Sequence, residues 1–291
     1  MSMLAPLFNG LMLGSLYGLF GLGLALSFGI MRVVNIAHGE FVVLSAYLGA
    51  VLLANTGLSV VEVVPLVVLC AFAAGWLLQS ALLNRIVGAN PVPGMIVTMG
   101  LSIIIRSALV TVFGAGIRSI DLGGIQDRGM TLCCGVSVGV LPVLVFGVAI
   151  LAFVALHLML TRTSIGRAFR AAADDAEMIE TLGFDRRRIY SAAMGLAVAL
   201  AALAGLLLAM QSSFSPYAGV ERLLLSFEVV IIGGLGSLRG AFLGGVTLGI
   251  VQVVGLSLDS DAGPLFQHVA FFVVLLWRQI PFATVLRWRS Q

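Results

Sequence analysis

Residues Leu7–Met31 read LFNGLMLGSLYGLFGLGLALSFGIM, and this stretch contains no charged side chain. A helix needs about 20 mainly apolar residues to cross the hydrocarbon core of a bilayer, so the stretch is long enough to span a membrane. The whole chain shares this character, because 60% of its 291 residues are hydrophobic and 10% are charged. Soluble domains carry about 25% charged residues. The sequence therefore predicts an all-α, polytopic membrane helical bundle.

Eight further apolar segments follow along the chain. Two of them are short for a membrane span, and the last, at residues 265–281, is slightly short. The segment at residues 41–54 spans only if its helix begins near Asn35, and residues 223–235 include Glu228. We expect nine crossings, or eight if either short segment is re-entrant. The predicted segments are Leu7–Met31, Phe41–Ala54, Val63–Leu83, Val92–Phe113, Val138–Leu160, Ile189–Met210, Leu223–Leu235, Gly240–Leu258 and Leu265–Pro281.

The arginines predict the orientation. All sixteen basic residues are arginine, and six of them fall between Thr161 and Ile189. Because cytoplasmic loops are enriched in basic residues, we place this loop inside the cell. Alternating crossings then leave three arginines outside, Arg118, Arg128 and Arg222. The prediction is an outside N-terminus and an inside C-terminus, and the basic pI near 9.1 requires no nucleic-acid partner.

The sequence contains no motif that indicates an enzyme or a metal-binding protein. Cys70, Cys133 and Cys134 form no CxxC or Cys/His spacing, which argues against a zinc or haem site. The chain has no HExxH motif and no pair of intramembrane aspartates, as a protease would need. It also has no Walker motif, so it cannot hydrolyse ATP alone. We expect a non-catalytic chain with no metal.

A polar break at residues 32–40 follows the first apolar segment. Asn35, His38 and Glu40 lie there, and polar groups near a membrane face must find partners or water. For Asn35 we favour a cap of the second helix. For His38 and Glu40 two interpretations are equally supported. They lie either at an ordinary helix boundary or in a broken helix that lines or gates a transport pathway.

Ionisable side chains also fall within the apolar segments. An ionisable group at mid-membrane costs about 3 kcal/mol on insertion scales, so it normally faces a partner or a cavity. Arg106 and Glu228 are expected either to pair with each other or to face a polar solute, and His268 shares their setting. His157 and Gln252 are predicted hydrogen-bond donors between helices.

Glycines recur in segments that are expected to pack closely. Small residues at four-residue spacing allow two helices to approach, so we expect ordinary helix packing. The spaced glycines are Gly10, Gly14 and Gly18 in the first segment, and Gly240, Gly244 and Gly245 near the end. A further group, Gly233, Gly234 and Gly236, predicts a tight turn between helices, with a flexible joint as the functional alternative.

The arginine-rich loop reads TRTSIGRAFRAAADDAEMIETLGFDRRR at residues 161–188. Ala171–Leu182 predicts a short helix rich in alanine and acidic residues, with Gly183 as its C-cap. The segment is too polar to enter lipid and too long for a simple turn. It is either a docking element for a soluble partner or a solvated loop.

These stretches resemble a known family. Ala172, Ala173, Asp174 and Gly183 resemble the coupling helix of ABC-importer permeases, although the usual glutamate-alanine-alanine core is not literally present. RVVNIAHGEF at residues 32–41 resembles the signature of Liv-type permeases for branched-chain amino acids, and NGLMLGSLYGLFGLGLALSFGIM at 9–31 and GGLGSLRGAFLGG at 233–245 are similar to theirs. The likeness runs over nearly the whole chain. Of the two permease types in such importers, the chain resembles the shorter one.

The resemblance implies one permease domain over residues 1–291, with a cytoplasmic coupling loop at 161–189, in a bacterial inner membrane. A second related permease would complete the pathway, two cytoplasmic ABC ATPases would dock and use ATP, and a periplasmic binding protein would deliver leucine, isoleucine or valine. No cofactor would bind the chain directly. Coupling candidates are Gly166, Arg167, Arg170, Ala172, Ala173, Asp174 and Gly183, and pathway or gating candidates are Asn35, His38, Glu40, Arg106, Glu228, Gly233, Gly234 and Gly236.

Other functions stay open at the level of sequence. Related importers carry urea, amides or other amino acids. A self-sufficient ion-coupled transporter would need more intramembrane carboxylates than Glu228. The outer loop at residues 114–135, with Asp121 and Asp127, is either a contact for the binding protein or a connector.

Overall fold

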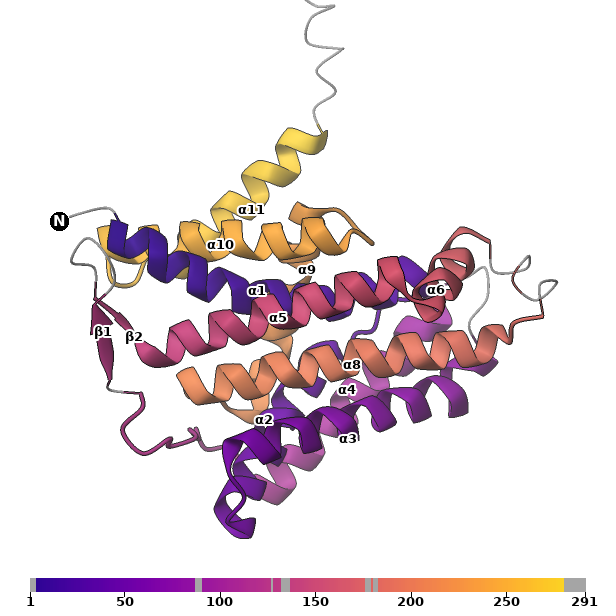
Figure 1. The fold of residues 1–291 in the computed structure, drawn as a ribbon, viewed down its shortest axis with the longest axis horizontal. Coiled ribbons are helices and arrows are strands. Elements are labelled where there is room, and N and C mark those ends of the chain that lie inside the picture. The colour runs from indigo at the N-terminus through magenta and orange to yellow at the C-terminus, as the bar shows by residue number, and fades with distance from the viewer. Residues whose placement is uncertain are drawn as a thin grey trace, which may run out of the picture.

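The computed structural model describes residues 4–86, 91–126, 128–131, 137–175, 179 and 183–279. These residues form ten α-helices and one small antiparallel sheet (Figure 1). The helices are α1 (Leu4–Met31), α2 (His38–Thr56), α3 (Val60–Ala81), α4 (Val92–Phe113), α5 (Val140–Arg162), α6 (Ser164–Asp174), α8 (Arg186–Gln211), α9 (Gly219–Gly233), α10 (Leu238–Leu258) and α11 (Gly263–Gln279).

Seven of the described helices are long and apolar enough to cross a membrane, namely α1, α2, α3, α4, α5, α8 and α10. Helix α9 has 15 residues, which is shorter than a full span, and the described part of α11 has 17. Each of the nine predicted segments contains a helix, and the all-α membrane fold is confirmed. Helix α2 begins at His38 rather than Asn35 or Phe41, and α9 begins at Gly219, before the predicted Leu223.

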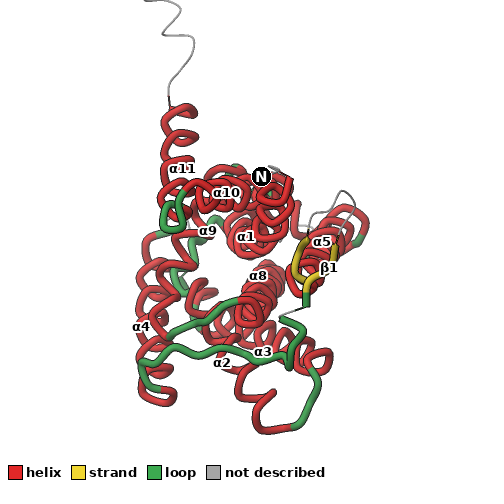
Figure 2. Tube along the Cα trace, turned by 90° about the vertical axis from the view of Figure 1, so that its left-hand side faces the viewer, coloured by secondary structure: helices red, strands yellow, loops and turns green. Residues whose placement is uncertain are grey.

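Helices α1 and α8 form the centre of the bundle. Figure 2 shows both of them end-on, surrounded by the other helices. Their side chains are mostly buried, as Leu16, Phe20, Met194 and Leu206 illustrate. Helices α3, α4 and α5 instead leave most of their apolar side chains on the surface. Such a surface suits a bilayer, whose lipid tails are as apolar as leucine.

Glycines bring α1 and α10 into backbone contact. A Cβ atom on Gly14 would lie 2.5 Å from the Cα atom of Val246, and one on Gly10 would lie 2.6 Å from the Cα atom of Ile250. A Cβ atom on Gly245 would collide with the backbone of Gly18. The predicted role of these glycines in helix packing is therefore confirmed.

The two ends of the bundle differ (Figure 1). Strand β1 (Gly129–Thr131) pairs with β2 (Ser137–Gly139), and this hairpin lies near the start of α1. Arg118 and Phe214 exchange two backbone hydrogen bonds of 2.8 Å, which ties the loop after α4 to the loop after α8. Helix α6 lies at the opposite end. The sequence did not predict the hairpin; Asp127, Cys133 and Cys134 lie outside the described residues.

Candidate functional site

Helix α2 begins inside the bundle, because a non-helical segment at residues 32–37 separates it from α1 and turns the chain back. Arg32 ends α1 with a φ of +53°, which is uncommon for a residue other than glycine. His38, the first residue of α2, then lies beside the middle of α1, where its Nε2 donates to the carbonyl oxygen of Phe20 at 3.0 Å. Gly23 leaves room for the ring, since a Cβ atom there would lie 2.8 Å from the His38 Cε1 atom.

Asn35 orders the turn that leads into α2. Its Oδ1 accepts a hydrogen bond from the Ala37 backbone N–H at 3.0 Å, and its carbonyl oxygen accepts one from the His38 N–H at 3.2 Å. This is an Asx turn. The N-cap of α2 is Ala37, so the predicted cap position of Asn35 is wrong. The Asn35 amide also contacts the Met194 sulfur of α8 at 3.7 Å.

One face of α4 lies against this break. Gly94, Thr98, Ser102 and Arg106 recur every four residues, so they share a face of the helix. Thr98 is fully buried, and its Oγ1 accepts a hydrogen bond from the Ile36 backbone N–H at 3.1 Å. Of these four residues, only Arg106 was a predicted site residue. Gly94, Thr98 and Ser102 could have been found from the sequence, because small and polar residues recur there every four positions within an apolar segment.

Glu40 and Arg106 form an ion pair in this region. The Arg106 Nη2 and Nε atoms donate to Glu40 Oε1 at 2.6 and 3.0 Å, and Ser102 Oγ donates to the same oxygen at 3.3 Å. The side chain of Glu40 is 1% exposed and that of Arg106 is 29% exposed. Glu40 Oε2 has no hydrogen-bond partner within the described part of the chain and lies against Gly219 of α9.

Of the two alternatives left open for Arg106 and Glu228, the one in which they pair with each other is wrong. Helix α2 starts deep in the bundle and so places Glu40 next to Arg106. Glu228 is also buried, at 2% exposure, but its partners come from α11. Gln267 Nε2 donates to Glu228 Oε2 at 2.8 Å, and His268 Nδ1 lies 2.5 Å from Glu228 Oε1. Gln267 was missed because one amide in an apolar segment gives no signal of its own.

The turn between α9 and α10 is tight. Gly234 has a φ of +97° and Gly236 a φ of +82°, conformations that side chains other than glycine rarely adopt. A Cβ atom on Gly240 would collide with the carbonyl oxygen of Gly233. Ser237 Oγ accepts from the Gly240 N–H at 3.1 Å and caps α10. This geometry agrees with the favoured tight-turn interpretation.

Helix α6 is the described part of the arginine-rich loop. Its N-cap is Thr163, whose Oγ1 accepts from the Gly166 N–H at 3.1 Å, and it ends at Asp174. The predicted helix Ala171–Leu182 is therefore wrong in its bounds, because the Thr163 cap starts the helix earlier and Asp175 is extended. A Cβ atom on Gly166 would collide with the Leu160 carbonyl oxygen at the corner between α5 and α6.

The coupling candidates take different positions around α6. Ala172 is buried and Ala173 is half-buried, while Arg167, Arg170 and Asp174 are exposed. Gly183 has a φ of +84°, and the next residue, Phe184, donates from its N–H to the carbonyl oxygen of Ile179 at 3.2 Å. The left-handed backbone of Gly183 is one that glycine adopts readily, as a C-cap position requires. Residues 176–178 and 180–182 lie outside the described residues.

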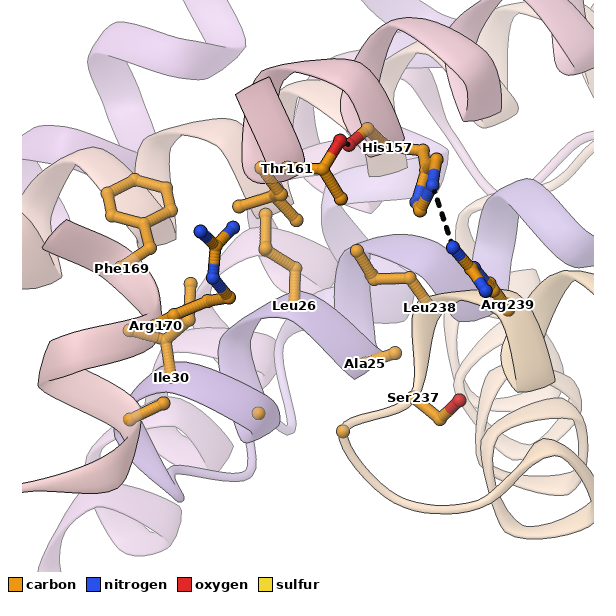
Figure 3. A pocket seen from close by; sticks show the side chains of 14 residues that line it. Ala25, Leu26, Ile30, His157, Thr161, Phe169, Arg170, Ser237, Leu238 and Arg239 are labelled. Carbon is orange, nitrogen blue, oxygen red and sulfur yellow. Dashed lines mark hydrogen bonds between the residues drawn. The ribbon is translucent and has the colours of Figure 1, made fainter. Parts of the chain in front are cut away.

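The two predicted interhelix donors, His157 and Gln252, both act as acceptors. His157 Nε2 of α5 accepts from Arg239 Nη2 of α10 at 3.1 Å (Figure 3). Gln252 Oε1 of α10 accepts from the Tyr17 hydroxyl of α1 at 2.5 Å. Over the described ranges, no three His, Cys, Asp or Glu side chains gather as a metal site.

Sequence comparisons place these features in a family. The profile of the branched-chain amino acid transport system permease component matches residues 6–277. The high-affinity branched-chain amino acid transport system permease protein BraD of Pseudomonas aeruginosa is 32% identical, over 94% of this chain and 92% of its own length. Its counterpart LivH of Escherichia coli K12 is 27% identical, over 94% and 91%. LivM of the same strain is 28% identical, over 90% and 66%. No solved structure matches.

Proposed function

This chain belongs to the family of branched-chain amino acid transport system permease components, and from that premise we propose its solute, pathway and partners. It is a multi-pass, non-catalytic membrane subunit of an ABC transport system. The proposed solutes are leucine, isoleucine and valine, because BraD and LivH carry branched-chain amino acid transport in their names and share nearly their whole lengths with this chain. The proposed location is a bacterial inner membrane.

The observation that carries the pathway proposal is the Glu40–Arg106 pair. An amino-acid zwitterion carries an ammonium and a carboxylate. In the pair, the Glu40 carboxylate complements the first and the Arg106 guanidinium complements the second. Arg106 remains 29% exposed, so part of its guanidinium is free to meet a solute carboxylate. Glu40 Oε2 is buried against Gly219 and lacks a hydrogen-bond partner in the described structure, so it would accept from the solute ammonium once α9 moves away from it. We therefore assign Glu40 and Arg106 to the polar section of the pathway.

The remaining pathway candidates would support this section. Asn35 and His38 fix the break from which Glu40 projects, since they bond to the turn and to the Phe20 carbonyl oxygen. Helix α9 carries Gly219 against Glu40 and also carries Glu228. The turn that follows α9, with Gly233, Gly234 and Gly236, would act as the joint about which this short helix moves during transport.

A second related permease would complete the pathway. Arg106 on α4 and His268 on α11 are partly exposed, and a polar side chain at mid-span is costly in lipid unless protein or water covers it. In Figure 2, α4, α9 and α11 lie along one side of the bundle. The likeness of the chain to LivM, another permease protein, supports a pair of related subunits.

Two cytoplasmic ATPase subunits would dock on the coupling helices of the two permeases, one of them on α6 of this chain. Phe169 and Ala172 bury one side of the helix, while Arg167 and Asp174 stay exposed at the arginine-rich end of the bundle. Gly166, Arg170, Ala173 and Gly183 complete the proposed coupling surface. ATP would be used by those subunits, with no cofactor on this chain. A periplasmic binding protein would dock at the opposite end, near the hairpin and Asp121 (Figure 1).

Uptake of labelled leucine into vesicles tests the proposal. The vesicles contain this chain, the neighbouring permease, the ATPases and the binding protein, and each component is omitted in turn. We expect uptake to require ATP and every component. Uptake by this chain alone, driven by an ion gradient, would overturn the ABC pathway and move Glu228 to its centre. Uptake of urea or an amide in place of leucine would overturn the proposed solute only.

A further inference from the structure

A cleft opens at the arginine-rich end of the bundle, between α6, the ends of α1 and α5, and the turn before α10 (Figure 3). Its volume is about 280 Å³. Its apolar wall consists of Leu26 and Ile30 of α1, Leu160 of α5, Phe169 of α6, and Leu238. The pathway described above does not use this cleft, which lies among the ends of the helices rather than beside Glu40.

Two arginines line the cleft together with this apolar wall. Arg170 comes from α6 and Arg239 from the start of α10, and both are exposed. In Figure 3, the guanidinium of Arg170 lies beside the Leu26 side chain, and Arg239 points toward His157. Arg239 donates to His157, which is not an anion in either protonation state. Among the described residues, neither arginine forms an ion pair with a carboxylate.

We propose that this cleft binds one acidic phospholipid, with its phosphate between Arg170 and Arg239 and an acyl chain along the apolar wall. Arginine guanidinium groups bind phosphate by paired, charge-assisted hydrogen bonds. Basic pockets between transmembrane helices on the cytoplasmic side suit anionic headgroups. Ser237, which also lines the cleft, provides a hydroxyl donor at its polar edge, whereas the Thr161 hydroxyl already donates to the His157 carbonyl oxygen.

The apolar wall is what selects a lipid over a soluble phosphate. A free phosphate or a nucleotide would satisfy the arginines but would leave the apolar side of the cleft uncovered where the half-buried Ala173 and Leu238 line it. Leu26, Ile30 and Leu160 are themselves at most 9% exposed and form the floor of this side. The lipid covers both kinds of surface at once. Because the cleft joins α6 to the turn before α10, the bound lipid would connect the proposed ATPase-docking helix to the joint beside α9.

Lipid binding to the assembled transporter tests this proposal without reference to transport. Native mass spectrometry compares retention of phosphatidylglycerol and phosphatidylcholine with identical acyl chains. We expect selective retention of phosphatidylglycerol. The substitution Arg239→Gln should weaken its affinity about fivefold, and the double substitution Arg170→Gln/Arg239→Gln about 25-fold, since each basic residue near the surface contributes about that factor. Arg85→Gln, at an exposed arginine outside the cleft, should change nothing.

Three outcomes would overturn the proposal. The first is equal retention of the two lipids by the unsubstituted transporter, a result that depends on no variant. The second is a double variant that binds phosphatidylglycerol as tightly as the Arg85→Gln control. The third is displacement of the lipid by millimolar inorganic phosphate, which would identify a site for soluble anions. Loss of leucine uptake with intact lipid binding would contradict the proposed function alone.

Discussion

Two buried carboxylates in this bundle are held in different ways. Glu40 is bound by Arg106, a side chain that stays charged, whereas Glu228 is bound by the amide of Gln267 and the imidazole of His268. Removing one partner from the first pair leaves an uncompensated charge, while the second carboxylate can be replaced by a neutral group. We therefore expect each member of the Glu40–Arg106 pair to need the charge of the other, and we expect hydrogen bonding to be enough around Glu228.

The largest expected effect comes from breaking the first pair. The substitution Glu40→Ala should lower the free energy of unfolding in detergent by about 3 kcal/mol, because Arg106 then lacks its counter-charge. The matched control is Glu221→Ala, which removes an exposed carboxylate bound to Arg222 and should cost less than about 1 kcal/mol. If both variants lost the same free energy of unfolding, the buried Glu40–Arg106 pair would stabilise the fold no more than an exposed ion pair does.

A change at Gly240 tests whether the position of α9 matters by itself, since this helix contacts Glu40 through Gly219 and carries Glu228. The substitution Gly240→Ala pushes a methyl group into the Gly233 carbonyl oxygen and should cost about 1–3 kcal/mol of unfolding free energy. Gly147→Ala is the control, since nothing lies within 4 Å of its added Cβ atom. Thermal melting of the two purified variants checks the difference, and equal melting temperatures would argue against the tight turn.

A neutral replacement at Glu228 sharpens the comparison. Glu228→Gln keeps the size of the side chain and part of its bonding, so it should cost about 0.5–1.5 kcal/mol and leave ATP-driven leucine uptake within about threefold of the unsubstituted protein. Glu40→Gln, measured in parallel, should lose most of its uptake. If Glu228→Gln abolished uptake while folding stayed intact, Glu228 would be an ion-coupling carboxylate.

The smallest effect is expected at the turn before α2. Asn35→Ala removes the hydrogen bond to the Ala37 N–H and should lower the free energy of unfolding by about 1 kcal/mol. Asn55→Ala, which removes an exposed bond to the Val51 carbonyl oxygen near the end of α2, should cost less. A larger loss in the Asn55 variant would mean that the Asx turn does not fix the start of α2.

The helices could be predicted from the sequence because apolar length and glycine spacing are local signals. Leu7–Met31 and the Gly10, Gly14 and Gly18 series needed no knowledge of the partner helix. The contact of Glu40 with Arg106 could not be predicted in this way. It depends on how far the chain returns into the bundle after Arg32, which is set by the His38 contact with α1 and by no local pattern.

The bounds of α6 were wrong for a different reason. The alanine and acidic run at residues 171–182 outweighed a local signal that the sequence did contain, namely Thr163 followed three residues later by Gly166 at the start of the helix. The side chains that surround Glu228 show the opposite limit. Gln267 and His268 reach Glu228 only when α11 packs on α9, so their roles follow from tertiary structure.

The most direct test replaces both members of the Glu40–Arg106 pair with methionine and measures stability and transport in the same preparation. Two apolar side chains of similar size should return the free energy of unfolding to within about 1 kcal/mol of the unsubstituted value, above either single variant. We predict that ATP-driven leucine uptake nevertheless stays at least about tenfold reduced. Recovery of uptake together with stability would contradict the account, because the pair would then be structural and would lie outside the pathway.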